Sequence, residues 1–385
     1  MIQLPLNRDN VIQAVFLERP NRFLVRCITD ERGVLDAYLP NPGRLWELLL
    51  PGASLYLYPT MDPEGAFPSQ RKTRFTVMAV QREESPIFLH THITNQVART
   101  LIERGEIPSL EHARVVRGEV TRGRSRFDLL LEQDGKDLYL EVKSCTLFGN
   151  GVAMFPDAVT QRGRRHLLEL AEMANAGIRS AVLFIVHSPK VTWFMPDFHT
   201  DYDFSTAFLK ARDRIMILPI AIQWTPDLTL GPEVKSLEVP WDYLRAEMRD
   251  RGSYLLILKI DRTMALEIGR LGTHTFSKGY YVYVGSAMRN LRTRVKRHLQ
   301  RRKKLHWHID YLTAHTGEMI PLPIRSSRRD ECEIAKALLS IMQMGPSGFG
   351  SSDCPCQTHL FFSDTNPLHI RAFHDVLKGF RMTHP

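Results

Sequence analysis

One stretch decides the fold of the middle of this chain: Arg126-Phe-Asp-Leu-Leu-Leu-Glu-Gln-Asp-Gly-Lys-Asp-Leu-Tyr-Leu-Glu-Val-Lys143. Its Asp134-Gly135 pair predicts a two-residue hairpin turn, because both residue types tolerate a positive φ angle. A turn centred there sets a register in which one face of the hairpin is wholly apolar. That face consists of Phe127, Leu129 and Leu131 opposite Val142, Leu140 and Leu138.

The other face of the hairpin carries charge. The same register sets Asp128 directly across from Glu141, and Arg126 across from Lys143. Opposed carboxylates repel on a sheet, so this pair requires a stabilising partner. A Mg²⁺ or Mn²⁺ ion bound by Asp128 and Glu141 would supply it, and Lys143 would position a water or stabilise charge on a phosphate. The alternative is an ordinary salt-bridged group of four on a solvated face.

The hairpin and its surroundings resemble a known combination of motifs. Asp128 followed by Glu141-x-Lys143 looks like the core of PD-(D/E)xK nucleases, and the wider pattern is similar to the sugar fermentation stimulation protein A family over about residues 1–240. The matching residues are Asn41-Pro-Gly-Arg44 with Leu48 and Pro51-Gly52, Arg126-x-Asp128, Glu141-Val-Lys-Ser144, Phe155-Pro-Asp-Ala158, and Thr160-x-Arg-Gly163 with His166. The resemblance implies an N-terminal oligonucleotide-binding (OB)-like barrel followed by a nuclease-fold domain that binds DNA.

Basic and polar residues near the hairpin are candidates for contacts with a nucleic-acid backbone. We expect Asp157 to cap a helix that runs to about residue 175, and Arg162 on this helix is the strongest candidate for a phosphate contact. His166 follows one turn later, where a packed role and a catalytic role are equally open. The remaining predicted contacts are Asn41, Arg44 and Arg126.

The chain is long enough for several domains. Residues 1–85 predict a small β-barrel of short strands at 13–17, 23–28, 34–39, 54–58 and 75–81. Residues 86–225 mix helices and strands, with 180–186 as the clearest buried strand. Residues 226–250 are rich in proline and are interpreted as a linker before a third domain at 251–385. The predicted class is multidomain α+β, with an OB-like barrel, a central PD-(D/E)xK-like α/β domain and a C-terminal α/β domain.

Positive charge is concentrated in the last third of the chain. From Arg251 onward there are 21 Lys and Arg against 10 Asp and Glu, and no acidic residue lies between Glu267 and Asp310. Without compensating acids, a polyanion is a better explanation of this run than a solvated helix face. The predicted nucleic-acid contacts in this part are Arg292, Lys296, Arg297, Arg301, Arg302, Lys303 and Lys304.

Cellular context follows from features the sequence lacks. No apolar run approaches the roughly 20 residues that span a bilayer, and the first ten residues do not have the character of a secretory signal. The five cysteines are scattered and odd in number, which favours reduced thiols over a disulfide framework. We therefore expect a cytoplasmic protein with no membrane partner.

A second set of motifs lies in the C-terminal third. Gly252-Ser-Tyr254 opens an apolar strand, and Gly279-Tyr-Tyr-Val-Tyr283-Val-Gly285 forms another. This pattern resembles the GIY-YIG nuclease module, in a small uncharacterised branch, over about residues 251–363. Ser253 and Val284 replace the two isoleucines of the motif, a change that affects packing more than chemistry.

Chemical roles can be assigned within this second set. Tyr254 and Tyr283 on neighbouring strands can hold or deprotonate a water, and Arg294 on the following helix can neutralise the scissile phosphate. His298 lies on the same helix face as Arg294. Glu331 falls on the apolar arc of a later helix, and an inward acid needs a partner, so it is the predicted metal-binding carboxylate. Half-buried tyrosines in an ordinary core are the alternative.

Zinc is disfavoured by the spacing of the candidate ligands. These are His306, His308, Asp310, Cys354, Cys356 and His359. A C-x-C pair without a second close pair fits no standard structural zinc site, and the two closely spaced histidines are not helical neighbours.

The sequence as a whole favours a metal-dependent nuclease with two nuclease-like sites. It would hydrolyse phosphodiester bonds of DNA, or of RNA, with activated water and Mg²⁺ or Mn²⁺. The alternative is a non-catalytic DNA-binding regulator of the sugar fermentation stimulation type. The sequence leaves homodimer formation open.

Overall fold

The computed structural model describes residues 10–60 and 73–383. The chain divides into two compact units. Unit 1 comprises Met1–Asp197 and Asp201–Pro240, and unit 2 comprises Phe198–Thr200 and Trp241–Pro385. Within the described residues, no helix is both long and apolar enough to cross a membrane.

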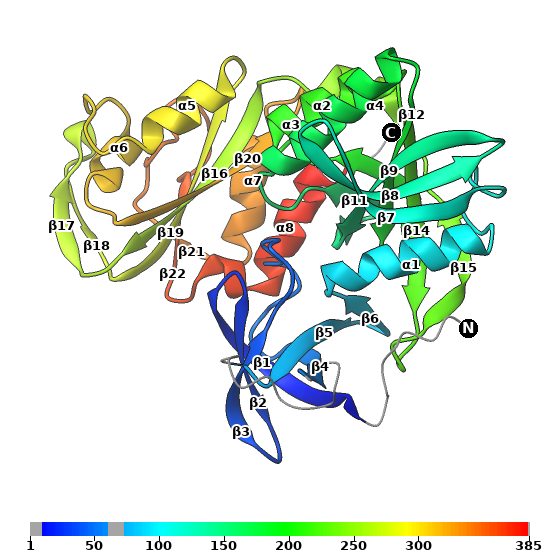
Figure 1. The fold of residues 1–385 in the computed structure, drawn as a ribbon. Coiled ribbons are helices and arrows are strands. Elements are labelled where there is room, and N and C mark those ends of the chain that lie inside the picture. Colours follow the sequence, from blue (N-terminus) through cyan, green and yellow to red (C-terminus); the bar gives the residue numbers. More distant parts are fainter. Residues whose placement is uncertain (1–9, 61–72, 384–385) are drawn as a thin grey trace. The chain divides into compact units, whose positions relative to one another are not determined.

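Unit 1 begins with a β-barrel (Figure 1). Its strands are β1 (Ile12–Asn21), β2 (Leu24–Thr29), β3 (Gly33–Tyr38), β4 (Ser54–Pro59), β5 (Phe75–Arg82) and β6 (Ser85–Phe88). The hydrogen-bonded order is β3-β2-β1-β4-β5-β6, and a further pairing of β3 with β5 closes the barrel. The five predicted strands are confirmed within one to four residues at their ends, and β6 is a strand that the sequence pattern did not predict.

The rest of unit 1 is built on a six-stranded mixed sheet of order β15-β14-β12-β9-β8-β7. Its strands are β7 (Arg114–Arg122), β8 (Ser125–Gln133), β9 (Lys136–Cys145), β12 (Arg179–Val186), β14 (Met216–Trp224) and β15 (Leu230–Ser236). A smaller sheet contains β10 (Leu147–Gly149), β11 (Val152–Phe155) and β13 (Trp193–Pro196). The helices are α1 (Thr91–Glu103), α2 (Gln161–Asn175) and α3 (Tyr202–Ala211).

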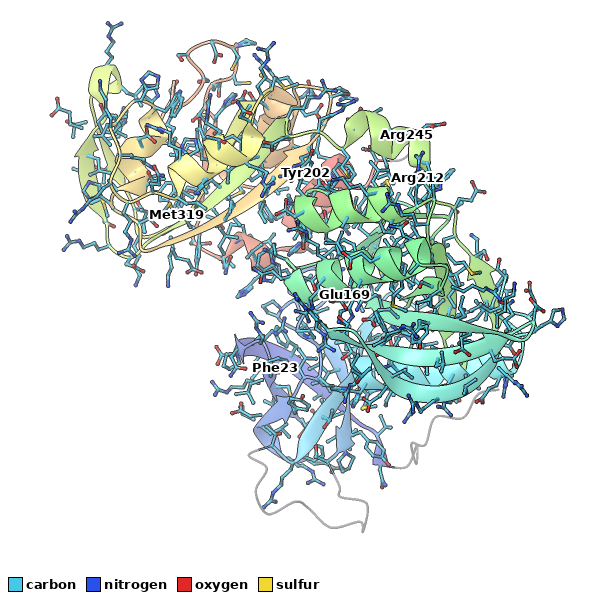
Figure 2. All side chains as sticks on the ribbon, turned by 45° about the horizontal axis from the view of Figure 1, so that its top comes forward. Phe23, Glu169, Tyr202, Arg212, Arg245 and Met319 are labelled. Atoms are coloured by element: carbon cyan, nitrogen blue, oxygen red, sulfur yellow. The ribbon has the colours of Figure 1, made fainter. Side chains whose placement is uncertain are left out.

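Helices cover both faces of the large sheet (Figure 1). Leu183 and Phe184 are neighbours on β12, so their side chains point to opposite faces. Leu183 belongs to the same aliphatic core as Val97 of α1, whereas the Phe184 ring packs against Phe208 of α3 at 6.0 Å between centroids. Figure 2 shows the side chains on this framework, with Glu169 on α2. The continuous apolar run of β12 follows from this burial on both faces.

The hairpin of β8 and β9 has the predicted register over most of its length. Asp134 and Gly135 have φ angles of 54° and 73°, and Leu129 pairs with Leu140. The ladder ends at this pair, so the expected direct opposition of Asp128 and Glu141 is not formed. The physical reason is that the Asp128 side chain accepts a hydrogen bond from the Val142 N–H, which a strand partner would otherwise have bonded.

The prediction that residues 226–250 form a linker is wrong. This segment instead contains β15, which pairs antiparallel with β14, and helix α4 (Trp241–Glu247). Strand β15 lies at the edge of its sheet, where a proline such as Pro232 is tolerated because an outward N–H has no ladder partner to lose. High proline content therefore did not indicate missing structure.

Unit 2 is organised around a five-stranded antiparallel sheet of order β20-β16-β19-β22-β21. These strands are β16 (Gly252–Ile260), β19 (Gly279–Ala287), β20 (Glu318–Arg325), β21 (Gln343–Met344) and β22 (Leu360–Ser363). A hairpin of β17 (Met264–Glu267) and β18 (Thr273–Phe276) is separate from this sheet. Besides α4, the α-helices of unit 2 are α5 (Leu291–His298), α6 (His308–Thr313), α7 (Glu331–Leu339) and α8 (Arg371–Arg381).

Candidate functional site

A cavity of about 660 Å³ in unit 1 gathers the predicted acidic residues. Asp128 reaches it from β8, Glu141 and Lys143 from β9, and Arg162 from α2. Asn95 of α1 lines the same cavity. Helix and hairpin thus bring together residues that are far apart in the sequence.

Glu141 is the most constrained acid in this cavity. Glu141 is only 3% exposed. Its Oε1 accepts hydrogen bonds from Lys143 Nζ and from His166 Nδ1, the latter at 2.5 Å. Burial alone would raise the pKa of Glu141, but Lys143 and His166 outweigh it and the pKa is lowered. Among the described residues, none donates a hydrogen bond to its buried Oε2. A buried anionic oxygen without a partner is costly, so the site is suited to a cation.

Asp128 is held beside Glu141 by neutral donors. Its Oδ1 accepts from Asn95 Nδ2 and its Oδ2 from the Val142 N–H, both at 2.8 Å. Burial, and then the charge of Glu141, raise the pKa of Asp128. The two acids are therefore electrostatically coupled although they are not a registered strand pair. Asn95 was missed because nothing in its helical sequence marks it as a partner for an acid.

His166 orients Glu141 from α2. The imidazole is buried, donates to Glu141 through Nδ1, and presents Nε2 to Arg162 Nε at 3.4 Å. The sequence left a packed and a catalytic role equally open for His166, and the geometry gives it a positioning role toward the acid. Arg162 itself is exposed at the cavity, so its guanidinium remains accessible to a phosphate.

Arg126 lies elsewhere. It is exposed and forms an ion pair with Glu119 at 2.9 Å, and it is not among the residues that line the cavity. Arg22, from the turn between β1 and β2, lines the cavity instead and was not predicted. A single arginine in a turn carries no sequence signal that would have singled it out.

The Asn41-Pro-Gly-Arg44 loop is fixed by Asp157, which corrects the predicted role of this acid. Thr160, not Asp157, caps α2 by accepting the Gly163 N–H. Asp157 Oδ2 accepts from the Leu45 N–H at 3.0 Å, and a Cβ on Gly43 would lie 2.6 Å from the same oxygen. A side chain at position 43 would therefore force this carboxylate or the loop to shift.

Asn41 and Arg44 have structural contacts of their own. Asn41 is buried, donates to the Leu89 carbonyl at 3.1 Å and accepts from the Gly43 N–H at 2.9 Å. The Arg44 guanidinium lies 4.7 Å from the centre of the Trp46 ring. Asn41 lines the cavity, whereas Arg44 does not.

A second polar cluster lies in unit 2 and contains the predicted tyrosines. The Tyr254 hydroxyl and His298 Nε2 are hydrogen-bonded at 2.8 Å, and the centres of the Tyr254 and Tyr283 rings are 6.3 Å apart. A Cβ on Gly285 would lie 2.4 Å from the Tyr254 hydroxyl oxygen, which accounts for that glycine of the motif. Burial raises the pKa of both tyrosines well above the usual value, which disfavours the tyrosinate form.

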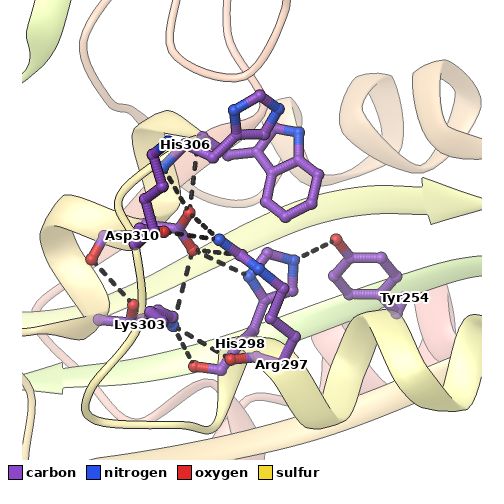
Figure 3. A network of polar contacts seen from close by, with 9 residues as sticks. Tyr254, Arg297, His298, Lys303, His306 and Asp310 are labelled. Carbon is purple, nitrogen blue, oxygen red and sulfur yellow. Dashed lines mark hydrogen bonds and ion pairs between the residues drawn. The ribbon is translucent and has the colours of Figure 1, made fainter.

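Asp310 anchors the polar network next to these tyrosines (Figure 3). It is fully buried, receives two hydrogen bonds from Arg297 at 3.0 Å each, and lies 3.5 Å from His298 Nδ1. The backbone N–H groups of His306 and Trp307 also bond it. Asp310 was considered only as a zinc ligand in the sequence, and these hydrogen bonds give it a structural role.

Two predicted phosphate contacts are drawn into this network. Lys303 has a side chain only 4% exposed, and its Nζ donates to the His298 carbonyl at 2.5 Å. The prediction that Lys303 contacts the nucleic-acid backbone is therefore corrected, because Asp310 attracts the ammonium group inward. Arg297 is likewise committed to Asp310. The exposed members of the basic run are Arg292, Lys296, Arg301, Arg302 and Lys304.

Arg294 and Glu331 lie close enough to act electrostatically on both tyrosines. The Arg294 guanidinium is 4.3 Å from the centre of the Trp307 ring, and its charge acts on both tyrosines. Glu331 accepts from Ser286 Oγ at 2.5 Å and lies 3.2 Å from His359 Nδ1. Burial would raise the pKa of Glu331, but His359 and Ser286 lower it.

Comparison with known proteins matches three successive segments of the chain to domain families. The SfsA N-terminal OB domain matches residues 17–89, the sugar fermentation stimulation protein RE domain matches 92–227, and the Domain of unknown function DUF123 matches 253–382. These matches confirm the barrel and the resemblance of the N-terminal part.

Individual relatives agree with the family models. A sugar fermentation stimulation protein homolog of Methanothermobacter thermautotrophicus is 35% identical over 215 residues, which are 56% of this chain and 87% of the relative. A homolog of Moorella thermoacetica is 39% identical over 212 residues, 55% of this chain and 88% of the relative.

A solved structure is also similar to this chain. The structure of Pyrococcus furiosus SfsA in complex with Ca²⁺ covers 60% of this chain and 95% of its own, with 26% identity and a TM-score of 0.54. Because the homologs match over most of their own length, the chain belongs to the sugar fermentation stimulation protein family, and it carries in addition a C-terminal domain of the DUF123 type.

Proposed function

We propose that unit 1 is a metal-dependent nuclease of the PD-(D/E)xK type that hydrolyses phosphodiester bonds of DNA or RNA. The observation that carries the proposal is the buried Glu141 Oε2, which has no hydrogen-bond partner among the described residues, in a cavity shared with Asp128 and Lys143. An unpaired anionic oxygen in a polar cavity is expected where a cation binds.

The residues present fit Mg²⁺ or Mn²⁺, because hard cations prefer carboxylate oxygens. Asp128 and Glu141 would hold the ion, which when bound supplies Lewis-acid stabilisation and a more acidic water. Lys143 places a positive charge beside the acids, His166 fixes the orientation of Glu141, and Arg162 is accessible to a phosphate. In the part of the chain that the structure describes, the hydrogen bonds to the two acids come from Asn95, Val142, Lys143 and His166 and not from a serine or cysteine, so water is the proposed attacking group.

The comparisons support a nucleic-acid ligand and a dication without establishing either. The matched OB domain belongs to a class of fold that binds single strands and oligonucleotides. The Pyrococcus furiosus relative is a Ca²⁺ complex, and Ca²⁺ takes the same kind of oxygen ligands as Mg²⁺.

Unit 2 is the second candidate site, of the GIY-YIG type. The observation in its favour is that Tyr254, Tyr283, Arg294, His298 and Glu331 lie in one cluster. Glu331 already bonds Ser286 and approaches His359, so its remaining lone pairs would have to serve any catalytic ion.

Incubation of the purified full chain with plasmid, single-stranded DNA and RNA, in Mg²⁺, Mn²⁺ or EDTA, tests the proposal. We expect metal-dependent cleavage that Glu141→Gln reduces by about 100-fold or more, in line with removal of an electrostatic catalytic group. Arg294→Ala and the double variant show whether unit 2 contributes. Glu119→Gln is the matched control, because Glu119 is exposed and outside the cavity.

The same experiment decides between an enzyme and a DNA-binding regulator. If the wild type binds nucleic acid but forms no product above the level of the double variant in any metal, the regulator interpretation replaces the nuclease. If the wild type and Glu141→Gln cleave equally, the activity does not come from the unit 1 site.

A further inference from the structure

Three cysteines and one histidine of unit 2 converge at one point. Cys332 lies in the first turn of α7, and Cys354, Cys356 and His359 lie in the segment that leads into β22. One ligand atom from each of these four residues lies within 4.8 Å of every other. Three of the five cysteines of the chain therefore meet at this point.

The distances suit a tetrahedral zinc site. With Zn–S of about 2.3 Å and Zn–N of about 2.0 Å, the edges of the tetrahedron are roughly 3.8 Å between sulfurs and 3.5 Å between sulfur and nitrogen. Cys354 Sγ lies 3.4 Å from His359 Nε2. The remaining separations are all at most 4.8 Å, so they need contractions of at most about 1.0 Å between sulfurs and about 1.3 Å between sulfur and nitrogen to reach these edges.

The geometry points to a Cys₃His zinc site formed by Cys332, Cys354, Cys356 and His359; this assignment is our own proposal. The sequence had argued against zinc because the C-x-C pair has no second close pair of ligands beside it, and Cys332 was not among the candidates, so the fourth ligand of this group was missing. Cys332 supplies it from a helix 22 residues earlier, and that proximity is visible only in the fold.

The surroundings of His359 support a metal ligand and not a packed imidazole. His359 Nε2 faces the thiols, while Nδ1 lies 3.2 Å from Glu331 Oε1. A metal-bound histidine commonly places its other nitrogen against a carboxylate, which fixes the ring and increases its basicity. Glu331 is fixed in turn by Ser286.

Zinc at this point would join two segments that carry the second candidate site. Glu331 precedes Cys332 directly, so a metal bound there fixes the start of α7 and the carboxylate that faces Tyr254 and Tyr283. We therefore assign the ion a structural role that positions Glu331, separate from any ion in the unit 1 cavity. The inference stands whether or not either unit cuts nucleic acid.

Metal analysis of the full chain purified under reducing conditions tests this assignment. We expect one zinc per chain, either as isolated or after Zn²⁺ is added to metal-free protein in competition with a chelating indicator. Cys354→Ser and Cys356→Ser should lose it, whereas Cys27→Ser, a buried cysteine of the barrel, should retain it. Co²⁺ in place of zinc should give the absorption of a tetrahedral thiolate complex in the wild type.

Two results would overturn the proposal. One is wild-type protein that takes up no more Zn²⁺ than Cys356→Ser in either measurement. The other is wild-type protein in which two of the three thiols are oxidised to a disulfide and no metal is bound. Glu331→Gln adds a graded readout, because removal of the carboxylate behind His359 should weaken zinc binding by about 10-fold or more without abolishing it.

Discussion

At the scale of single residues, the chemistry of unit 1 depends on how two neighbouring acids, buried Glu141 and half-buried Asp128, are stabilised. Glu141 has cationic partners on one oxygen and none on the other, while Asp128 has only neutral donors. A site prepared for a cation in this way is expected to reduce stability when the ion is absent.

Asp128→Asn should raise the free energy of unfolding of metal-free protein. Burial and Glu141 raise the pKa of Asp128, so its ionisation costs the folded state stability as pH rises from the usual Asp pKa through the raised one. The stability difference between variant and wild type should grow through that window and then stay constant. Urea unfolding in EDTA across the acid-to-neutral range measures it, and Mn²⁺ should reverse the order of the two proteins.

A flat difference across this pH range would show that Asp128 does not titrate as the geometry indicates. Glu141 should show the opposite pH dependence. Because its pKa is lowered, its ionisation stabilises the folded protein at pH values above the usual Glu pKa, and this contribution is lost as the pH falls through the lowered pKa.

At the scale of elements, the basic segment after α5 contains three exposed cationic side chains, Arg301, Arg302 and Lys304, and one buried one, Lys303. Replacement of Arg301, Arg302 or Lys304 by an uncharged residue should make the plot of log affinity against log salt concentration less steep. The slope should fall in magnitude by about 0.9 for each phosphate of duplex DNA that the variant no longer neutralises. Lys303→Met should leave the slope unchanged and lower the melting temperature, because the Lys303 ammonium group lies 3.6 Å from buried Asp310. DNA titrations at several salt concentrations measure the slopes, and equal slopes for Lys303→Met and Lys304→Met would contradict the assignment.

The loop that joins the barrel to the cavity gives a second prediction at this scale. Gly43→Ala should lower the free energy of unfolding by about 1–3 kcal/mol, because the new Cβ would meet the Asp157 carboxylate. Gly118→Ala in β7 is the control, since its nearest neighbour would lie at 3.6 Å. Denaturant unfolding compares the two, and a harmless Gly43→Ala would mean that the loop moves freely away from Asp157.

Elements were predictable where local chemistry determines them. The Asp134-Gly135 turn fixed the register of β8 and β9, and alternating apolar residues located the barrel strands. Contacts between distant elements were not predictable: Asn95 and Cys332 reach their partners from helices whose own sequences are ordinary, and the sequence marked His166 without showing that it bonds Glu141. Lys303 shows the same limit, because only the position of Asp310 turns one lysine of a basic run inward.

At the scale of the whole molecule, the chain carries two proposed metal sites in different units. Hydrogen exchange followed by mass spectrometry should distinguish them. Mn²⁺ added to zinc-loaded protein should slow exchange in β8, β9 and α1 and leave α7 unchanged, because bound ions protect the elements that ligate them. Zinc removal should have the opposite pattern, with faster exchange in α7 and residues 354–360. Protection of α7 as well would show that Mn²⁺ also binds in unit 2, whereas unchanged exchange in β8 and β9 would contradict the unit 1 site.

The central claim is that the cavity beside Glu141 binds the dication that cleavage requires. Calorimetric titration of Mn²⁺ into zinc-loaded full-length protein tests it most directly. We predict that the wild type and Glu119→Gln bind Mn²⁺ in the unit 1 cavity and that Glu141→Gln abolishes this binding. Wild-type protein that binds no Mn²⁺, or that binds it no more tightly than Glu141→Gln, would contradict the claim.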